Sequence, residues 1–562
     1  MKGKSSNPVL ALGAAARAVY LMTAVLALVA CHGGSNSANS SSYTLGGTIS
    51  GLNAGGSFLL EYNDSASVTV AAGTTTWVFA TPFPAGSSYS VSVLTEPVGE
   101  LCEVTSGSTG TLTANVDNVT VVCSVYGQWT WEGGLDALNA SGVYGTQSAA
   151  AASNLPGARY DSSSWTDSSG NFWLFGGDGY DATGGTGYLN DLWQYSPSTG
   201  LWTWVSGGNA DNADGVYGTQ GTASASNIPG ARYSASSWID SSGNFWLFGG
   251  YGYDSAGGVG RLNDLWRYSP STGQWTWVSG GNADNASGVY GTQGNGSAGD
   301  VPGARYSASS WIDSSGNLWL FGGVGNATTG SVGNLNDLWR FSPSAGQWTW
   351  VGGGNGANAS GVYGTQGSAA ATNAPGARQA AGAWADSSGN FWLFGGYGFD
   401  SAGGAGYLND LWRYSPSSGQ WTWLGGGSGV NASGVYGTQG SAAATNVPGS
   451  RQAASAWADS SGNFWLFGGS GYDSTGGLGT LNDLWQYSPS TGLWTGVSGS
   501  SGDNAAGAYG TQGTVSASTA PGAREAANSW IDSSGHLWLF GGAGYGSSGN
   551  GYLNDLWKFV PP

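Results

Sequence analysis

Histidine and cysteine are scarce in this sequence, with two histidines and three cysteines among 562 residues. The two histidines, His32 and His536, stand far apart in the chain. Metal sites and acid–base relays that need several imidazoles are therefore excluded, and we expect no cofactor. Carboxylate pairs remain as catalytic groups, but no pair stands out from the rest of the sequence.

Charge is also scarce, and its balance is acidic. Only 8% of the residues are charged, and 32 Asp and Glu against 14 Lys and Arg give a formal net charge of −18. A surface of that sign repels phosphate, so nucleic acid is excluded as a partner. The chain is not disordered, because its 30 tryptophans require burial. With 104 glycines as turn formers, the composition predicts an all-β fold.

The first thirty residues are typical of an export signal. Lys2, Lys4 and Arg17 precede an apolar run over residues 18–30, which is short for a membrane span and is expected to be cleaved. The run ends in Leu28-Val29-Ala30-Cys31, which resembles the lipobox of bacterial lipoproteins. An ordinary signal peptide followed by an incidental cysteine is the alternative.

The lipobox resemblance implies a mature protein that begins at a lipid-bearing Cys31 and is held in a membrane. In that family an Asp after the cysteine retains the protein at the inner membrane, whereas His32 here favours the outer membrane or cell surface. Polar residues 31–42 are typical of a tether.

Residues 43–124 are predicted to form a small antiparallel β-sandwich, immunoglobulin-like in general plan, because short alternating runs recur there. We expect it to act as a spacer. Cys102 and Cys123 lie in this segment, and an exported compartment oxidises thiols. The two cysteines are therefore predicted to form one disulfide.

Residues 125–562 repeat with a period of 73 residues. The triplet Phe-Gly-Gly ends at Gly177, Gly250, Gly323, Gly396, Gly469 and Gly542. The same step relates Arg159, Arg232, Arg305, Arg378, Arg451 and Arg524. Each copy divides into four strand-like runs separated by Gly and Pro turns, for example residues 232–238, 245–250, 262–268 and 274–278. Two tryptophans are expected on each fourth strand, but Gly496 replaces one of them.

The Gly-Gly doublet, the Asn-Asp-Leu-Trp run and the tryptophan of the fourth strand resemble the kelch family. The resemblance implies a six-bladed β-propeller over residues 125–562. The chain begins this region at Gln128-Trp-Thr-Trp131 and ends it at Leu553-Asn-Asp-Leu-Trp-Lys-Phe559, so the two ends are predicted to complete one blade. Kelch propellers include galactose oxidases, whose copper needs two Tyr and two His, and the shortage of histidine excludes that chemistry.

Three repeated polar features have alternative interpretations. The six Arg either form an anion-binding ring at the channel mouth or pair within their own blades. The Asp that follows each first strand, for example Asp167, is expected to cap its turn. The carboxylates of residues 209–214 hint at calcium, but they are absent from other copies such as residues 354–358.

Loop length predicts which face of the propeller binds a ligand. Loops after the second and fourth strands are long and share one face, whereas the other turns are tight, and binding residues concentrate on long loops. The loops after the second strand carry one aromatic each in five copies, and Asn326 is the exception. These aromatics are Tyr180, Tyr253, Phe399, Tyr472 and Tyr545. They either contact a ligand or pack on a neighbouring loop.

The sequence thus favours a monomeric, non-catalytic binding scaffold for glycan or protein. A carbohydrate-acting enzyme that uses loop carboxylates, or a purely structural envelope protein, is the alternative. Near-identical copies argue against an enzyme, because a catalytic site needs different residues in different blades.

Overall fold

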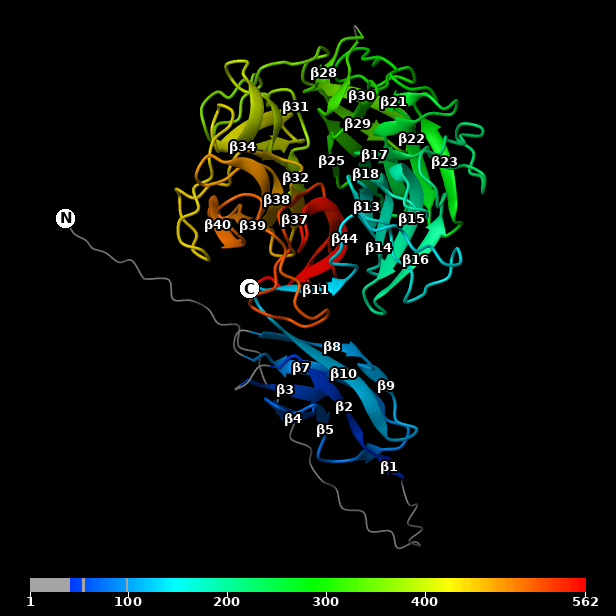
Figure 1. Cartoon of the computed structure of the whole chain (residues 1–562), viewed down its shortest axis with the longest axis vertical. Helices are drawn as coiled ribbons and strands as arrows, with labels where there is room; N and C mark the ends of the chain where they lie inside the picture. The colour runs from blue at the N-terminus through cyan, green and yellow to red at the C-terminus, as the bar shows by residue number, and fades with distance from the viewer. Residues whose placement is uncertain (1–40, 53–55, 98–99, 329) are drawn as a thin grey trace, which may run out of the picture.

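The computed structural model describes residues 41–52, 56–97, 100–328 and 330–562, and all their regular structure is β (Figure 1). No helix among these residues is long and apolar enough to span a membrane. The expected signal segment, Cys31 and most of the tether lie outside the described residues. Two groups of sheets are present, one formed by residues 42–125 and one by residues 129–559.

The first group consists of two four-stranded sheets, in the orders β5-β2-β10-β8 and β4-β3-β7-β9, with β1 and β6 paired beside them. Its strands are β1 (Ser42–Tyr43), β2 (Leu45–Ser50), β3 (Ser57–Tyr62), β4 (Ala66–Ala71), β5 (Thr76–Val78), β6 (Phe83–Pro84), β7 (Ser88–Thr95), β8 (Glu100–Ser106), β9 (Thr109–Thr111) and β10 (Val116–Val125). Both sheets contribute to one apolar core that includes Phe58, Leu60, Trp77 and Val121.

The predicted disulfide is confirmed, because Cys102 on β8 and Cys123 on β10 are bonded and lie directly opposite each other. The expectation of a wholly antiparallel arrangement is wrong. β2 and β10 pair in parallel, with Gly47 opposite Val119. The first long strand and the last strand of this group therefore run side by side in the same direction.

The second group consists of six units that repeat the same strand plan. Unit 1 comprises β12 (Arg159–Tyr160), β13 (Ser163–Thr166), β14 (Phe172–Tyr180), β15 (Thr186–Ser196) and β16 (Leu201–Ser206). Unit 2 comprises β17 (Arg232–Tyr233), β18 (Ser236–Ile239), β19 (Phe245–Phe248), β20 (Tyr251–Tyr253), β21 (Val259–Arg261), β22 (Leu265–Ser269) and β23 (Gln274–Ser279). Unit 3 comprises β24 (Arg305–Tyr306), β25 (Ser309–Ile312), β26 (Leu318–Phe321), β27 (Val324–Asn326), β28 (Val332–Asn334), β29 (Leu338–Ser342) and β30 (Gln347–Gly352).

Units 4 to 6 follow the same plan. Unit 4 comprises β31 (Arg378–Gln379), β32 (Gly382–Ala385), β33 (Phe391–Phe399), β34 (Ala405–Ser415) and β35 (Gln420–Gly425). Unit 5 comprises β36 (Arg451–Gln452), β37 (Ser455–Ala458), β38 (Phe464–Tyr472), β39 (Leu478–Ser488) and β40 (Leu493–Ser498). Unit 6 comprises β41 (Arg524–Glu525), β42 (Asn528–Ile531), β43 (Leu537–Tyr545), β44 (Asn550–Phe559) and β11 (Trp129–Gly133).

The four predicted strands of each unit are confirmed, with the first strand split in two in every unit and the second and third strands also split in units 2 and 3. The second strand buries consecutive residues, as in the Phe172-Trp-Leu-Phe175 run of β14, so both faces of the sheet are covered. The covering comes from the neighbouring unit. One core cluster joins Trp165 and Trp173 of unit 1 to Phe245 and Trp266 of unit 2, and each of the other units meets a neighbour in the same way.

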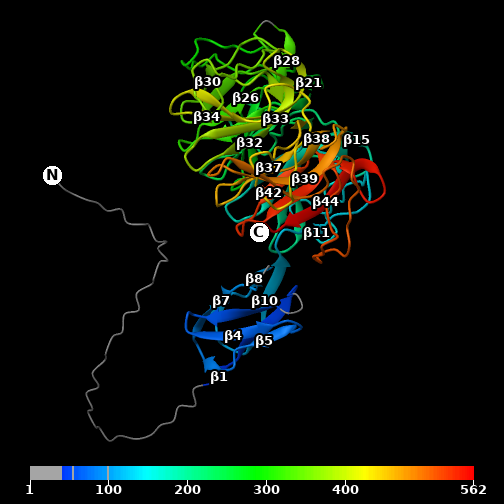
Figure 2. The same ribbon diagram turned by 90° about the vertical axis from the view of Figure 1, so that its left-hand side faces the viewer.

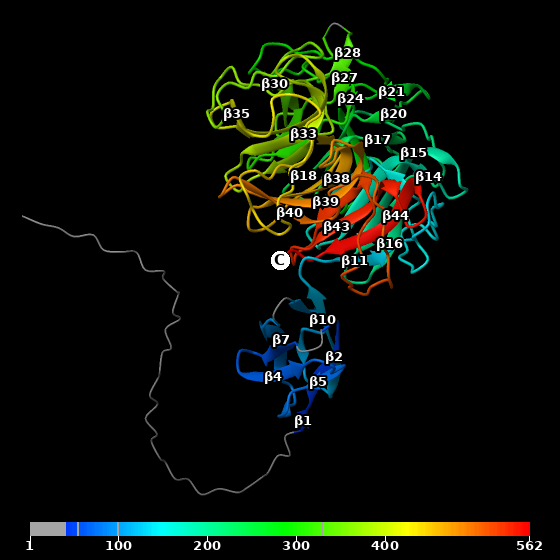
Figure 3. The ribbon, with the colours of Figure 1, turned by 60° about the vertical axis from the view of Figure 1, so that its left-hand side comes forward.

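The six units follow one another around a closed ring (Figures 1 and 3). Each inner strand contacts the next in the series β13, β18, β25, β32, β37 and β42, and β42 contacts β13 again. The predicted joining of the chain ends is confirmed, because β11 pairs with β44 and places Trp129 opposite Phe559. This pairing removes a sheet edge that would otherwise be free to aggregate.

The first group of sheets lies beside unit 6, where β10 leads into β11 (Figure 2). A side-chain contact joins the two groups. The Nε2 atom of His536, in the turn between β42 and β43, lies 3.6 Å from Oε2 of Glu103 on β8.

Candidate functional site

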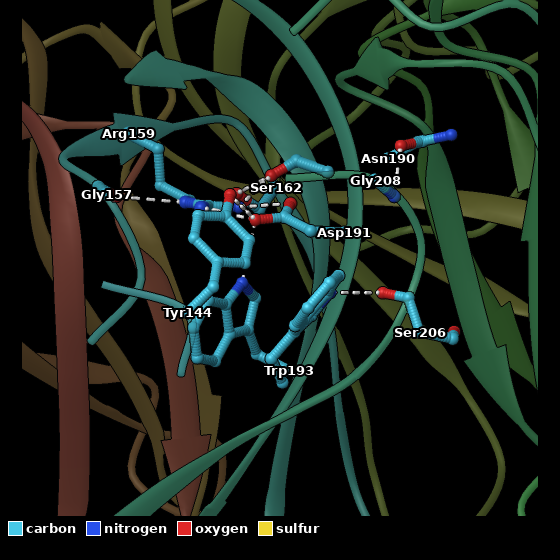
Figure 4. A network of polar contacts seen from close by, with 11 residues as sticks. Tyr144, Gly157, Arg159, Ser162, Asn190, Asp191, Trp193, Ser206 and Gly208 are labelled. Atoms are coloured by element: carbon cyan, nitrogen blue, oxygen red, sulfur yellow. Dashed lines mark hydrogen bonds and ion pairs between the residues drawn. The ribbon is translucent and has the colours of Figure 1, made fainter. Parts of the chain in front are cut away.

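The six repeated arginines are buried inside their own units and do not form an anion-binding ring. Arg159 donates two hydrogen bonds of 2.7 Å to the two carboxylate oxygens of Asp191, and both side chains are fully buried (Figure 4). Tyr144 and Trp193 donate to the same carboxylate over 2.6 and 2.7 Å. The equivalent pairs are Arg232–Asp264, Arg305–Asp337, Arg378–Asp410, Arg451–Asp483 and Arg524–Asp555.

This network is structural because its donors and acceptors are satisfied within the protein. Arg159 also donates to the carbonyl oxygens of Gly157 and Gly176, which ties the start of the first strand to the glycine pair of the second. Burial raises the pKa of Tyr144, and the negative charge of Asp191 adds to this effect, so the phenol remains a donor. A buried ion pair of this kind leaves no group free for a ligand.

The predicted turn-capping role of the repeated aspartates is confirmed. Oδ1 of Asp167 accepts hydrogen bonds from the backbone N–H groups of Ser169 and Asn171, and Oδ2 accepts from the indole of Trp173. These contacts fix the backbone conformation of the tight turns on one face of the ring. They also lower the pKa of Asp167 against the opposing effect of burial.

A continuous belt of backbone hydrogen bonds surrounds the axis of the ring. Asp161 donates its N–H to the carbonyl oxygen of Ala526, and Ser234 donates to Asp161, over 2.9 and 2.8 Å. The series continues through Ser307, Ala380 and Ala453 back to Ala526, with bonds of 2.8 to 2.9 Å. All six residues have φ between 50 and 54°, in the left-handed region, although none is glycine.

The belt residues and those that follow them line a cavity of about 190 Å³ at the axis. Around this cavity the six units differ. The belt position holds Asp161, Ser234 and Ser307 in units 1 to 3 but alanine in units 4 to 6. The preceding position holds tyrosine in units 1 to 3 and Gln379, Gln452 and Glu525 in units 4 to 6. We call the cavity and this preceding ring of residues the axial mouth.

Tyrosines gather on one side of the axial mouth. The ring of Tyr233 lies 6.3 Å from that of Tyr160 and 6.0 Å from that of Tyr306, centre to centre. The Tyr160 hydroxyl donates to Asp178 over 3.3 Å, and its ring lies 4.9 Å from that of Tyr552. All of these rings are partly exposed.

Two carboxyl groups at the axial mouth have shifted pKa values. Burial raises the pKa of Asp161 to about 6, and the charge of Asp178 adds to the shift while Ser234 opposes it. Burial raises the pKa of Glu525 to about 7, with a further contribution from Asp161. No arginine, lysine or histidine forms an ion pair with either carboxyl in the described part of the chain. Arg261 donates to Asn326 over 2.7 Å, and its charge acts on Tyr306 of the axial mouth.

The five aromatics predicted to lie in loops are at the ends of strands instead. Tyr180 ends β14 and is paired with Thr186 of β15, because the second and third strands continue as a hairpin beyond the glycine pair. All five rings are partly buried. Tyr180 packs edge-on against Tyr552, Tyr253 against Tyr188 and Tyr472 against Tyr407, each in the preceding unit.

The residues of the axial mouth were missed in the sequence prediction, which sought features shared by all copies. The signal was present as a departure from the repeat, because Arg159-Tyr-Asp161 in unit 1 corresponds to Arg524-Glu-Ala526 in unit 6.

In the 209–214 segment, whose carboxylates hint at calcium, Asn212 donates a hydrogen bond to Asp211 over 3.1 Å. No group of three or more His, Cys, Asp or Glu suited to a metal ion occurs among the residues that the structure describes.

No protein-family model matches this chain, and no curated protein matches it in sequence.

Proposed function

We propose that the six units are the blades of a kelch-type β-propeller over residues 125–562, and that residues 43–124 are an immunoglobulin-like sandwich that spaces it from the membrane. The support is the 73-residue period, the four strands of each unit and the sharing of one unit by the two chain ends. The proposal also makes this an exported, lipid-anchored protein at the outer membrane or cell surface. The disulfide is compatible with that location, because such compartments oxidise thiols.

In this proposal the protein is a monomeric, non-catalytic scaffold that binds glycan or protein through the face with the longer loops. The observation that carries it is the variation at the axial mouth. The buried Arg–Asp pair and the Trp of the third strand recur in all six units, whereas the mouth changes from Tyr and Ser to Gln, Glu and Ala. A purely structural ring has no need of such a change, while a ligand without six-fold symmetry does.

The chemistry of the axial mouth suits a polar ligand with flat apolar faces. Tyr160, Tyr233 and Tyr306 offer partly exposed rings for stacking, and Asp161 and Glu525 offer acceptors for hydroxyl or amino groups. Tyr180 and Tyr253 extend this aromatic surface outwards through their contacts with Tyr552 and Tyr188. Phe399, Tyr472 and Tyr545 occupy the same register in units 4 to 6.

A glycan array and a pull-down from envelope extracts test this function with three variants. The first replaces Tyr160, Tyr233 and Tyr306 by Ala, and the second replaces Tyr180, Tyr253, Phe399, Tyr472 and Tyr545 by Ala. The control replaces the exposed Ser168, Ser241 and Ser314 of the tight turns by Ala. Binding by the wild type and the control, with loss in the first variant, supports the axial mouth. Equal binding by all three variants would contradict it.

A second candidate is a carbohydrate-acting enzyme that uses the carboxyl groups of the axial mouth. It is favoured by the pKa values of Asp161 and Glu525, about 6 and 7, which lie in the range of catalytic acids and bases. Release of reducing ends from any glycan bound on the array, abolished by Glu525→Gln with binding retained, would establish this enzyme. Binding without turnover leaves the scaffold as the function.

A further inference from the structure

One of the six units lacks a side chain that the other five share. In five units the fourth strand carries a second tryptophan, which is Trp131, Trp204, Trp277, Trp350 or Trp423. Unit 5 has Gly496 in its place. Gly496 lies opposite Trp485 on β39, as Trp204 lies opposite Trp193 on β15. The missing group is therefore an indole in a defined orientation.

The five complete units show what this place holds. In unit 1 the Trp204 ring packs edge-on against Tyr144, with centres 5.2 Å apart, and its Nε1–H donates to the carbonyl oxygen of Ser206 over 2.9 Å. The other four indoles pack on their tyrosines at 5.2 to 5.3 Å and donate to the residue two positions later over 2.7 to 3.0 Å. All five rings are partly exposed, so the place is open to solvent.

In unit 5 a cavity of about 210 Å³ occupies this place. Its walls include Tyr436 and Ser498, which correspond to the two partners of the indole in unit 1, and also Asp483 and Gly496. Tyr436 keeps its hydrogen bond of 2.6 Å to Asp483 and its tilted ring contact with Trp485, whose centre lies 4.8 Å away. Its ring is partly exposed, whereas the five equivalent tyrosines are only 4 to 6% exposed.

The cavity is large enough for an aromatic ring, and its walls combine the ring of Tyr436 with polar groups such as those of Gln439 and Ser498. An apolar cavity of about 150 Å³ engineered into another protein binds benzene, so about 210 Å³ accommodates a two-ring system. A Cβ atom on Gly496 would meet the Trp485 ring at 3.6 to 3.8 Å, which is ordinary contact, so the backbone leaves the space open. The edge-on contact with Tyr436 and the carbonyl of Ser498 would orient a ring that carries one N–H donor.

We propose that the cavity at Gly496 binds a small planar aromatic molecule of the indole class, which occupies the place of the missing tryptophan side chain. The ligand packs its edge against Tyr436 and donates its N–H to the Ser498 carbonyl. This site is in the outer part of unit 5 and does not depend on the function proposed for the axial mouth.

Calorimetric titration of the full-length protein with indole tests the proposal. The wild type should bind indole at one site, and 1-methylindole, which lacks the donor, should bind several-fold more weakly. Gly496→Trp should fill the cavity, raise the melting temperature and weaken indole binding by about tenfold or more. The matched variant Trp423→Gly opens the same place in unit 4 and should bind indole at two sites.

These variants separate the cavity from other sites of indole binding. Retention of the wild-type affinity by a folded Gly496→Trp variant would overturn the proposal, as would the absence of binding to the wild type at millimolar indole. If Gly496→Trp does not fold, Trp423→Gly decides. An increase from one site to two supports the proposal, and an unchanged stoichiometry contradicts it.

Discussion

The backbone N–H of Asp161 donates a hydrogen bond of 2.9 Å to the carbonyl oxygen of Ala526, and this bond closes the belt around the axis. It joins the first unit to the sixth, and it places the one acidic belt residue beside the unit that carries Glu525. Closure of the ring and the chemistry of the axial mouth therefore depend on the same short segments.

The left-handed conformation of the belt is expected to cost stability wherever the residue has a Cβ atom. Ala380 has φ of 50°, and replacing it by glycine removes this strain without removing the backbone bond. Ala380→Gly should therefore raise the free energy of unfolding by about 1 kcal/mol. Chemical denaturation checks this, with Ala381→Gly as the control. Equal destabilisation by both changes would contradict the assigned conformation.

Removal of one member of the buried ion pair should destabilise the ring strongly. Asp191→Ala leaves the Arg159 guanidinium buried without its carboxylate, which should cost about 3–5 kcal/mol. The double variant Arg159→Met, Asp191→Leu should lose less, because no charge remains buried. Denaturation followed by tryptophan fluorescence compares the two. A single variant as stable as the wild type would argue against the observed network.

The sheet of unit 6 contains strands from both ends of the repeat region, so truncation at one end should destabilise it. Deletion of residues 125–131 removes Trp129, which packs on Phe559, and exposes the edge of β44. Loss of that burial should cost several kcal/mol and promote aggregation, with the loss of Trp129 alone costing about 3–5 kcal/mol. Thermal melting and size-exclusion chromatography provide the check. A monodisperse protein with an unchanged melting temperature would be inconsistent with the pairing of β11 and β44.

Stability should depend on pH through Glu525. Because its pKa is raised to about 7, the folded protein binds more protons than the unfolded chain between about pH 4 and pH 7. The free energy of unfolding should therefore fall as the pH rises through this window. Glu525→Gln should reduce the slope and stabilise the protein above pH 7 by up to about 3 kcal/mol. Urea denaturation across this range measures it, and identical slopes would rule out the raised pKa.

The proposed lipid anchor predicts a change of cellular fraction. Cys31→Ala should release the protein from the membrane fraction, because no other residue is expected to carry the lipid. Immunoblotting of separated fractions and mass spectrometry of the mature N-terminus give the result. A variant that stays membrane-bound and still lacks residues 1–30 would show that the lipid assignment is wrong.

Much of the fold could be predicted because the repeat constrains it. Gly177 has φ of 100°, and a Cβ there would lie 2.7 Å from the carbonyl oxygen of Tyr160, so the recurrence of the glycine doublet marks a fixed local geometry in every unit. The pairing of β11 with β44 follows in the same way from the incomplete first and last copies.

Other features depend on packing that the repeat does not encode. The direction of the Arg159 side chain, into the unit and away from the axis, depends on the position of Asp191 in three dimensions. The placement of Tyr180 in a strand depends on how far the hairpin extends beyond the doublet. The parallel pairing of β2 with β10 brings together the two ends of a non-repetitive segment, where strand alternation alone does not set direction. The axial mouth was missed because its residues vary.

Hydrogen–deuterium exchange of the protein, with and without the ligand identified by the array or the pull-down, locates the binding surface. Binding at the axial mouth should slow exchange at residues 158–162, 231–235 and 304–308, which surround its Tyr side. Protection confined to the tight turns at residues 167–171 and 240–244, or to residues 43–124, would contradict it.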